Sequence, residues 1–271
     1  MDQTDKTLPG KTWSISTIMR RVGLDCFSGG LAALTVAPIM LTVDKAVVEN
    51  SSGKTTIAKS VVSSVKSLAF TPLKFIMRRD FSWVFFVYGS TYMSANSIDS
   101  LCKITGTNDV LPKLIGVTAV NMTTGILKDR AFAYYFGKSG AGKVGKASIL
   151  IWFVRDVLTI AGAFVIPSRL AKIIEDRGTD KSVAEKTSQF ISPVGFQVVL
   201  TPFHLLGYDL YNNPTRKAAT RGTNILSMYP SATSIRMVRM GGAYGVGGVN
   251  NKSIRHRFIS AFEGEDWDDH Y

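Results

Sequence analysis

The sequence predicts an all-α membrane protein with six transmembrane helices arranged as three similar helix hairpins. Apolar residues make up 45% of the 271-residue chain and charged residues only 19%, whereas soluble domains carry about a quarter charged residues. The apolar residues come in blocks, and the longest have the length that a helix needs to cross a bilayer. The first and fifth blocks also share a proline that an acid follows six or seven residues later.

The first block is the clearest membrane helix in the sequence. Residues 26–43 are eighteen consecutive uncharged residues, and the early part of the block is rich in glycine, alanine and serine. Small residues let helix backbones approach closely inside a membrane. Pro38 predicts a kink near the end of the block, and Asp44 and Lys45 close it. We therefore expect a packed helix rather than a lipid-facing anchor.

Further apolar blocks follow at residues 81–98, 114–127, 147–167, 187–208 and 240–251. Hydropathy alone supports the first, second and fifth blocks as membrane spans, and the other three also fit buried helices. Between the first two blocks, residues 46–69 mix lysine with valine and isoleucine at helical spacing, which predicts an amphipathic surface helix. The predicted domain organisation therefore has three parts: a polar segment (1–21), a six-helix membrane domain (22–258) and an acidic tail (259–271).

Charge and composition exclude several classes of protein. The net charge is +12, but the basic residues lie between apolar blocks and form no stripe with aromatics, so no nucleic-acid partner is expected. Membrane lipids are the expected partners, with cardiolipin as one candidate. The chain's two cysteines have no ligand spacing, which predicts no metal site and no cofactor. The apolar blocks contain no Ser-His-Asp or paired-carboxylate arrangement, so we expect no enzyme.

The strongest candidates for ligand contact are charged residues within the even blocks. Arg155 and Asp156 lie side by side in the fourth block, where ionisable residues are expected to face a cavity. Adjacent helical residues point about 100° apart, so we expect each to face a different partner. Arg155 would bind a carboxylate through two hydrogen bonds. Arg236 and Arg239, at the start of the sixth block, are the other candidates, whereas His204 is expected at the membrane boundary.

In helix order the chain resembles the mitochondrial carrier family, whose odd helices each close with a proline, an acid and a base. The best matches are the stretches FVRDVLT (153–159) and RMVRMGGAYG (236–245), which resemble two of the family's even helices. Pro38 and Pro202 keep the proline of the motif, but the acid of the motif is missing after both. The residues that could supply displaced gating ion pairs are Asp44, Lys45, Asp129, Arg130 and Asp209.

The resemblance implies a multi-pass solute carrier of the mitochondrial inner membrane. It would exchange small anionic or amino-acid-like metabolites, with a substrate site formed by Arg155, Asp156, Arg236 and Arg239. The incomplete motifs leave an alternative open, in which a carrier fold without transport serves as an accessory subunit of a respiratory or ATP-synthase complex.

Overall fold

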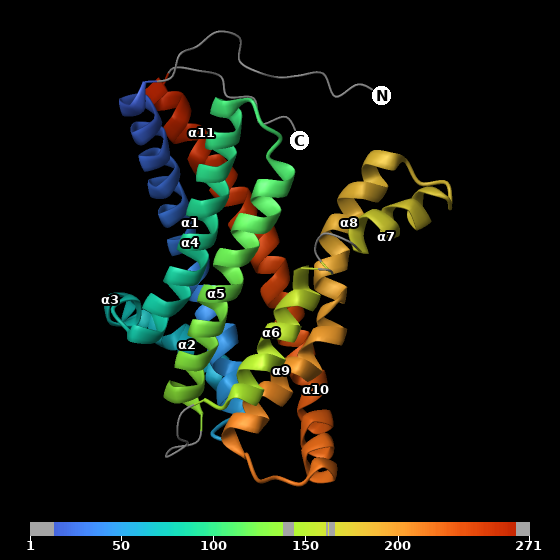
Figure 1. The fold of residues 1–271 in the computed structure, drawn as a ribbon. Helices are drawn as coiled ribbons and strands as arrows, with labels where there is room; N and C mark the ends of the chain where they lie inside the picture. The colour runs from blue at the N-terminus through green and yellow to red at the C-terminus, as the bar shows by residue number, and fades with distance from the viewer. Residues whose placement is uncertain (1–13, 138–143, 161, 163–165, 264–271) are drawn as a thin grey trace. The chain divides into compact units, whose positions relative to one another are not determined.

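The structure is a computed structural model that describes residues 14–137, 144–160, 162 and 166–263, and every regular element in these ranges is helical (Figure 1). The longer helices are α1 (Ile15–Ser51), α4 (Arg79–Thr105), α5 (Val110–Phe136) and α10 (Ala218–Gly241). The shorter ones are α2 (Ile57–Phe70), α3 (Pro72–Ile76), α6 (Lys146–Ile160), α7 (Ile166–Glu175), α8 (Lys181–Gly195), α9 (Gln197–Asn212), the π-helix η2 (Gly242–Gly248) and α11 (Val249–Glu263). The prediction of an all-α protein is thus confirmed for the described residues.

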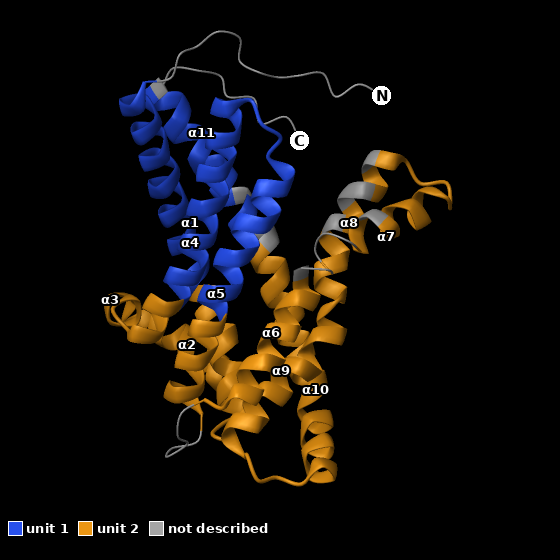
Figure 2. Ribbon diagram, in the orientation of Figure 1, with its two compact units in different colours: residues 1–37, 84–125, 246–271 blue, residues 38–83, 126–245 orange. Residues whose placement is uncertain are grey.

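The chain divides into two compact units, shown in different colours in Figure 2. Unit 1 comprises residues 1–37, 84–125 and 246–271, and unit 2 comprises residues 38–83 and 126–245. Helices α1, α4 and α5 contribute segments to both units, and in α1 the division falls at Pro38. A proline inside a helix removes one backbone hydrogen bond and crowds the preceding turn.

Unit 1 is held together by close helix contacts and buried polar groups. An ideal Cβ built on Gly29 of α1 would lie 2.7 Å from the backbone nitrogen of Met93 in α4, so only glycine permits this approach. Phe27 and Phe258 pack edge to face, with ring centroids 5.1 Å apart, and join α1 to α11.

Unit 2 contains a small apolar core formed by Val47, Leu205 and Ala232, which come from α1, α9 and α10. Trp152 of α6 is fully buried and packs against Tyr208 of α9, with ring centroids 5.0 Å apart. Gly207 lies directly beneath the Trp152 indole, where a Cβ would collide with the ring. These contacts bring α6, α9 and α10 close together.

Within the described residues, three helical segments are long and apolar enough to cross a membrane: Ile15–Ser51, Val110–Phe136 and Phe190–Asn212. They contain the first and third apolar blocks and most of the fifth. The expectation that hydropathy alone would support the second block is wrong, because α4 is not among the three. Residues 81–98 lack charges, but their Ser, Tyr and Trp side chains make the segment less apolar than its lack of charge suggests.

The structure does not confirm the predicted threefold hairpin repeat. The helices range from 5 residues in α3 to 37 residues in α1, and α7 and α8 form a helix pair with no visible counterpart among the described helices. Helix α1 begins at Ile15, within the predicted polar segment 1–21, and α11 reaches Glu263, within the predicted acidic tail. Residues 1–13 and 264–271 of those two segments lie outside the described ranges.

The amphipathic helix predicted for residues 46–69 is divided between two helices. α1 continues to Ser51, and α2 starts at Ile57 after a turn in which Gly53 has a positive φ of 76°. Thr56 caps α2 because its side chain accepts a hydrogen bond from the backbone nitrogen of Lys59 at 3.4 Å. The turn therefore separates a buried end of α1 from the surface helix α2.

Candidate functional site

Eight ionisable side chains gather within unit 2, and we call them the unit 2 charge cluster. They lie on five helices, namely α1, α5, α6, α9 and α10. The members are Asp44, Lys128, Asp129, Arg155, Asp156, His204, Arg236 and Arg239. Charged side chains inside a membrane protein are costly unless they are paired, so each must be traced to its partner.

Asp129 and Arg155 form the centre of the unit 2 charge cluster. Asp129 accepts a hydrogen bond from Arg155 Nη1 at 2.6 Å and from the Tyr208 hydroxyl at 3.3 Å, and its Oδ1 lies 3.0 Å from Lys128 Nζ. Arg155 also donates from Nε and Nη2 to Asp156 Oδ1, at 2.9 and 2.6 Å. The expectation that Arg155 and Asp156 face different partners is wrong, because the long arginine side chain turns back to reach its neighbour.

Asp44 joins α1 to two other helices of unit 2. It pairs with Lys128 of α5, and its Oδ1 lies 2.8 Å from Nε of Arg239 in α10. Arg239, predicted to contact substrate, is therefore held by a carboxylate of the protein. The acid of the first block is a structural partner here, but its bases come from α5 and α10 rather than from the adjacent Lys45.

His204 lies inside the unit 2 charge cluster, whereas the sequence predicted a position at the membrane boundary. It is buried, and its Nδ1 lies 2.7 Å from Arg155 Nη1. A guanidinium can only donate, so Nδ1 accepts and the ring proton is on Nε2. The imidazole therefore completes the coordination of Arg155, which leaves that arginine with three protein partners.

Arg236 differs from the other arginines of the unit 2 charge cluster. It is 5% exposed, and its Nη2 donates to the side-chain oxygen of Gln197 at 3.0 Å. Among the described residues no carboxylate pairs with it, and its Nε has no hydrogen-bond partner. The positive charges of Arg155 and Arg239 and the negative charges of Asp44 and Asp129 also act on it. A buried guanidinium with these surroundings is suited to an anionic ligand.

The charge balance of the cluster agrees with this reading. Four cationic side chains, from Lys128, Arg155, Arg236 and Arg239, are present with three carboxylates, from Asp44, Asp129 and Asp156. The carboxylate of Asp156 uses only Oδ1, and its buried Oδ2 has no partner in the described part of the chain. The cluster thus offers one unmatched cation and one unmatched carboxylate oxygen.

The other predicted gate residues lie apart from these ion pairs. Asp209 pairs with Arg216 and, at 2.7 Å, with Arg221, which ties the end of α9 to the start of α10. Lys45 lies 3.8 Å from Glu49 and over the Phe136 ring. Arg130 is exposed, and the expected ion pair between Arg130 and Asp129 does not form. Pro38 and Pro202 lie inside α1 and α9.

Unit 1 has a charge network of its own, centred on Arg255 of α11. Arg255 donates to Asp25 at 2.8 Å and to Asp99 at 2.7 Å, and also to the Ser100 hydroxyl at 2.9 Å. Next to it, Asn96 and Asn251 exchange two hydrogen bonds between their side-chain amides. Here the arginine is fully matched by acids, so the network serves to join α1, α4 and α11.

Sequence reasoning missed Lys128 and Gln197 at the unit 2 site and Arg255 in unit 1. Lys128 and Asp129 are adjacent, so the run LKDR at 127–130 contained the signal, but the acid was assigned to the wrong base. No sequence signal distinguishes Gln197, because an uncharged amide in an apolar block has many possible roles. In the described residues no group of three or more His, Cys, Asp or Glu side chains could hold a metal ion.

Comparison with known proteins gives one informative match. The model of a protein family described as probable citrulline exporter matches residues 28–259, a range that includes the whole unit 2 charge cluster. None of the curated proteins matches the chain. The resemblance to the mitochondrial carrier family is wrong, because the matching family is a different one. Short stretches around arginines in apolar helices are too general to distinguish two families of membrane proteins.

Proposed function

We propose that the chain, which belongs to the protein family described as probable citrulline exporter, carries citrulline or a closely similar amino acid across a membrane. Citrulline has an α-carboxylate, an α-ammonium group and an uncharged ureido group. The observation that carries the proposal is Arg236, a buried guanidinium that has an amide partner and no carboxylate among the described residues. The family's description as an exporter agrees with the prediction that the chain is not an enzyme.

The carboxylate of the substrate would bind to Arg236. Its Nε is buried and unpaired, and Gln197 holds Nη2. Guanidinium and carboxylate form short, charge-assisted hydrogen bonds, and often two of them in parallel. Gln197 is itself fixed, since its side-chain nitrogen donates to the Pro193 carbonyl at 3.2 Å. This second contact would keep the guanidinium oriented when the site is empty.

The ammonium group would bind to Asp156. Arg155 occupies Oδ1 of this carboxylate and leaves the buried Oδ2 without a donor. A carboxylate oxygen accepts more than one hydrogen bond, and an ammonium group is a strong donor. Arg155 and Arg239, predicted above to bind substrate, are instead assigned to positioning, because protein carboxylates already hold both of them.

We further propose that α4, α6 and α10 cross the membrane together with the three apolar segments. Between Arg221 and Lys252 the only charged residues are Arg236 and Arg239, and residues 81–98 have none. Arg155 and Asp156 of α6 and Arg236 and Arg239 of α10 point into the unit 2 charge cluster, which supports the burial of these helices against protein rather than lipid. This would retain the predicted number of six spans without the carrier repeat, but the last span would lie in α10, whereas the predicted sixth block (240–251) falls mostly in η2 and α11.

The location and the alternative function depended on the carrier resemblance. Residence in the mitochondrial inner membrane stays a prediction, and fractionation of cells that produce the tagged chain checks it. The alternative, an accessory subunit of a respiratory or ATP-synthase complex, was motivated by missing carrier motifs. A member of the exporter family needs no such motifs, so that motive no longer applies.

Transport by the purified chain in proteoliposomes tests the proposal. Labelled citrulline trapped inside should leave wild-type vesicles, and Arg236→Gln should raise the KM by roughly 10- to 100-fold, the range of a lost charged hydrogen bond. Arg257→Gln is the matched control, because Arg257 is an exposed arginine of α11 outside the cluster. Wild-type vesicles that release no citrulline, or an Arg236→Gln variant with unchanged KM, would contradict the proposal.

Two analogues separate the two contacts. Citrulline amide lacks the α-carboxylate, and 5-ureidopentanoate lacks the α-ammonium group. The wild-type protein should prefer citrulline to both. Arg236→Gln should lose only the preference over the amide, and Asp156→Asn should lose only the preference over 5-ureidopentanoate. If both variants lose both preferences equally, the assigned contacts are incorrect.

A further inference from the structure

Helix α2 buries two serines and exposes several apolar side chains, which is unusual for a helix on the surface of a water-soluble protein. Ser60 and Ser64, one turn apart, are buried against unit 2. Ser60 donates to Glu49 Oε2 of α1 at 2.6 Å, and Ile57 packs against the apolar core of unit 2. The Ser60 hydroxyl and Ile57 therefore hold α2 in place, while Val62, Val65 and Phe70 remain exposed.

The outward face of α2 and α3 is apolar. Four exposed residues follow the 4-3-4 spacing of one helix face, namely Ala58, Val62, Val65 and Ala69. Beyond them, Phe70, Leu73 and Met77 are 81%, 75% and 84% exposed. We call residues 57–77 the α2–α3 arm. Large exposed apolar surfaces of this kind mark contact sites for a membrane or a protein.

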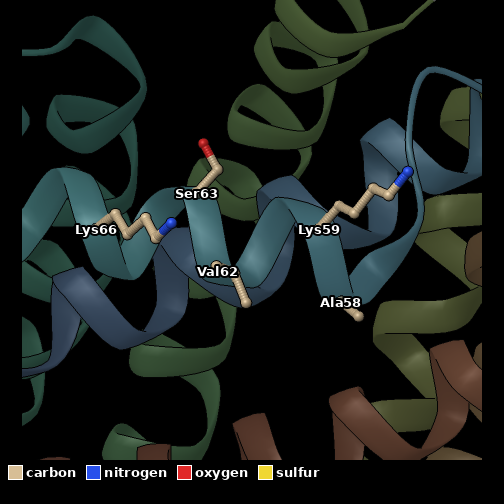
Figure 3. A pocket seen from close by; sticks show the side chains of 5 residues that line it. All are labelled: Ala58, Lys59, Val62, Ser63 and Lys66. Carbon is tan, nitrogen blue, oxygen red and sulfur yellow. The ribbon is translucent and has the colours of Figure 1, made fainter.

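Charge identifies the partner that fits the arm. Residues 50–79 contain no acid and six basic residues, namely Lys54, Lys59, Lys66, Lys74, Arg78 and Arg79. Lys59 and Lys66 are seven residues apart, and together with Ala58, Val62 and Ser63 they line a hollow of about 440 Å³ on α2 (Figure 3). Two lysines beside exposed apolar side chains complement a phosphate group that is joined to an acyl chain.

We propose that the α2–α3 arm lies on the membrane surface and binds an anionic phospholipid. Lys59 and Lys66 contact the phosphate, and Val62, Val65 and Phe70 enter the outer part of the acyl region. Amphipathic segments with this division of basic and apolar residues lie in the interface of bilayers, and each basic residue adds to their affinity for anionic lipid. The inference does not depend on which solute the protein transports.

A fluorescent reporter at Phe70 tests this proposal in the full-length protein. Phe70→Trp is reconstituted in phosphatidylcholine vesicles that contain brominated phosphatidylglycerol or brominated phosphatidylcholine, since bromine quenches a nearby tryptophan. The unmodified protein supplies the background of the native tryptophans. We expect both brominated lipids to quench the added tryptophan. The anionic lipid should reach the same degree of quenching at a lower proportion of the total lipid. Inorganic phosphate in the buffer should not reduce that difference, because the ligand is a lipid.

The lysines are tested in the same background. Lys59→Gln with Lys66→Gln should lower the preference for the anionic lipid by about fivefold per lysine, or roughly 30-fold together. Lys146→Gln with Lys217→Gln removes two exposed lysines outside the arm and should leave the preference unchanged. The proposal is overturned if neither brominated lipid quenches the reporter, because this would mean that protein or water covers the face instead of lipid. Equal quenching by both lipids in the unsubstituted arm would also overturn it.

Discussion

Asp129 is the residue on which most of the unit 2 charge cluster depends. Its carboxylate contacts Lys128, Arg155 and the Tyr208 hydroxyl, which come from α5, α6 and α9. It is 1% exposed, so no water replaces these contacts when it is removed. By contrast, Arg236 has no carboxylate partner in the described residues, and the protein therefore holds it at a cost in stability. The two residues separate a structural role from a ligand-binding one.

We predict that Asp129→Ala strongly destabilises the protein. The substitution leaves the cations of Lys128 and Arg155 without their shared acid, and breaking a buried pair in this way costs about 3–5 kcal/mol. Tyr208→Phe removes one donor to this carboxylate and leaves both ion pairs in place, so it should cost less, about 1.5–3 kcal/mol. Thermal unfolding of both variants in the same detergent measures the difference. Equal losses would mean that Asp129 does not hold the cluster together.

Among the individual residues, the charged members of the site were predictable from the sequence, but their pairing was not. Arg155, Asp156, Arg236 and Arg239 stand out because charges are rare in apolar helices. Which arginine remains unmatched depends on where three other helices place their acids, and no local pattern contains that information. Neighbours in the sequence were poor guides, since Asp44 pairs with Lys128 rather than with Lys45.

Among the helices, α1 shows why small residues in the first block matter. Gly29 brings α1 against the backbone of α4 at Tyr92 and Met93, where backbone atoms cannot move aside. Gly23, six residues earlier in the same helix, has open space around the position of a Cβ. The same residue type therefore has opposite roles at two positions on one helix.

We predict that Gly29→Ala destabilises the protein by about 1–3 kcal/mol, the usual cost of overpacking. Gly23→Ala should instead be neutral or stabilising by up to about 1 kcal/mol, because alanine favours a helix over glycine and meets no neighbour. The two melting temperatures, measured side by side, should move in opposite directions. If the Gly29→Ala protein has the same melting temperature as the wild type, α1 and α4 do not pack this closely.

The elements themselves were largely predictable, and their grouping was not. The first three apolar blocks each lie within a single helix, because apolar runs and helical spacing are local properties. The threefold repeat was inferred from two prolines and the acids that follow them, at Pro38 and Pro202. These prolines lie in helices of 37 and 16 residues with different neighbours, so the similarity of their sequences does not extend to the fold.

For the whole molecule, length and hydropathy alone identify three segments, although the unit 2 charge cluster also buries charged residues of other helices. The three segments are long and apolar enough to cross a membrane, whereas α4 and α10 are not apolar enough and α6, with 15 residues, is too short. Yet α6 and α10 carry Arg155, Arg236 and Arg239, whose side chains are turned toward the unit 2 charge cluster. A charge that is matched inside the protein lowers the hydropathy of its helix without exposing it to lipid. If α4, α6 and α10 cross the membrane as proposed, a count of apolar segments alone underestimates the number of crossings.

The number of crossings has a direct consequence for the two ends of the chain. If only the three apolar segments cross, the ends lie on opposite sides of the membrane, because three is odd. With α4, α6 and α10 added there are six crossings, and we predict that both ends lie on the same side. Protease treatment of sealed vesicles that contain a chain with a different epitope tag at each end measures this. Both tags should be cleaved together or protected together within any one orientation of the vesicles. Cleavage of one tag with protection of the other would exclude six crossings. The burial of Arg236 without a carboxylate among the described residues would then have to be explained without a site inside the membrane.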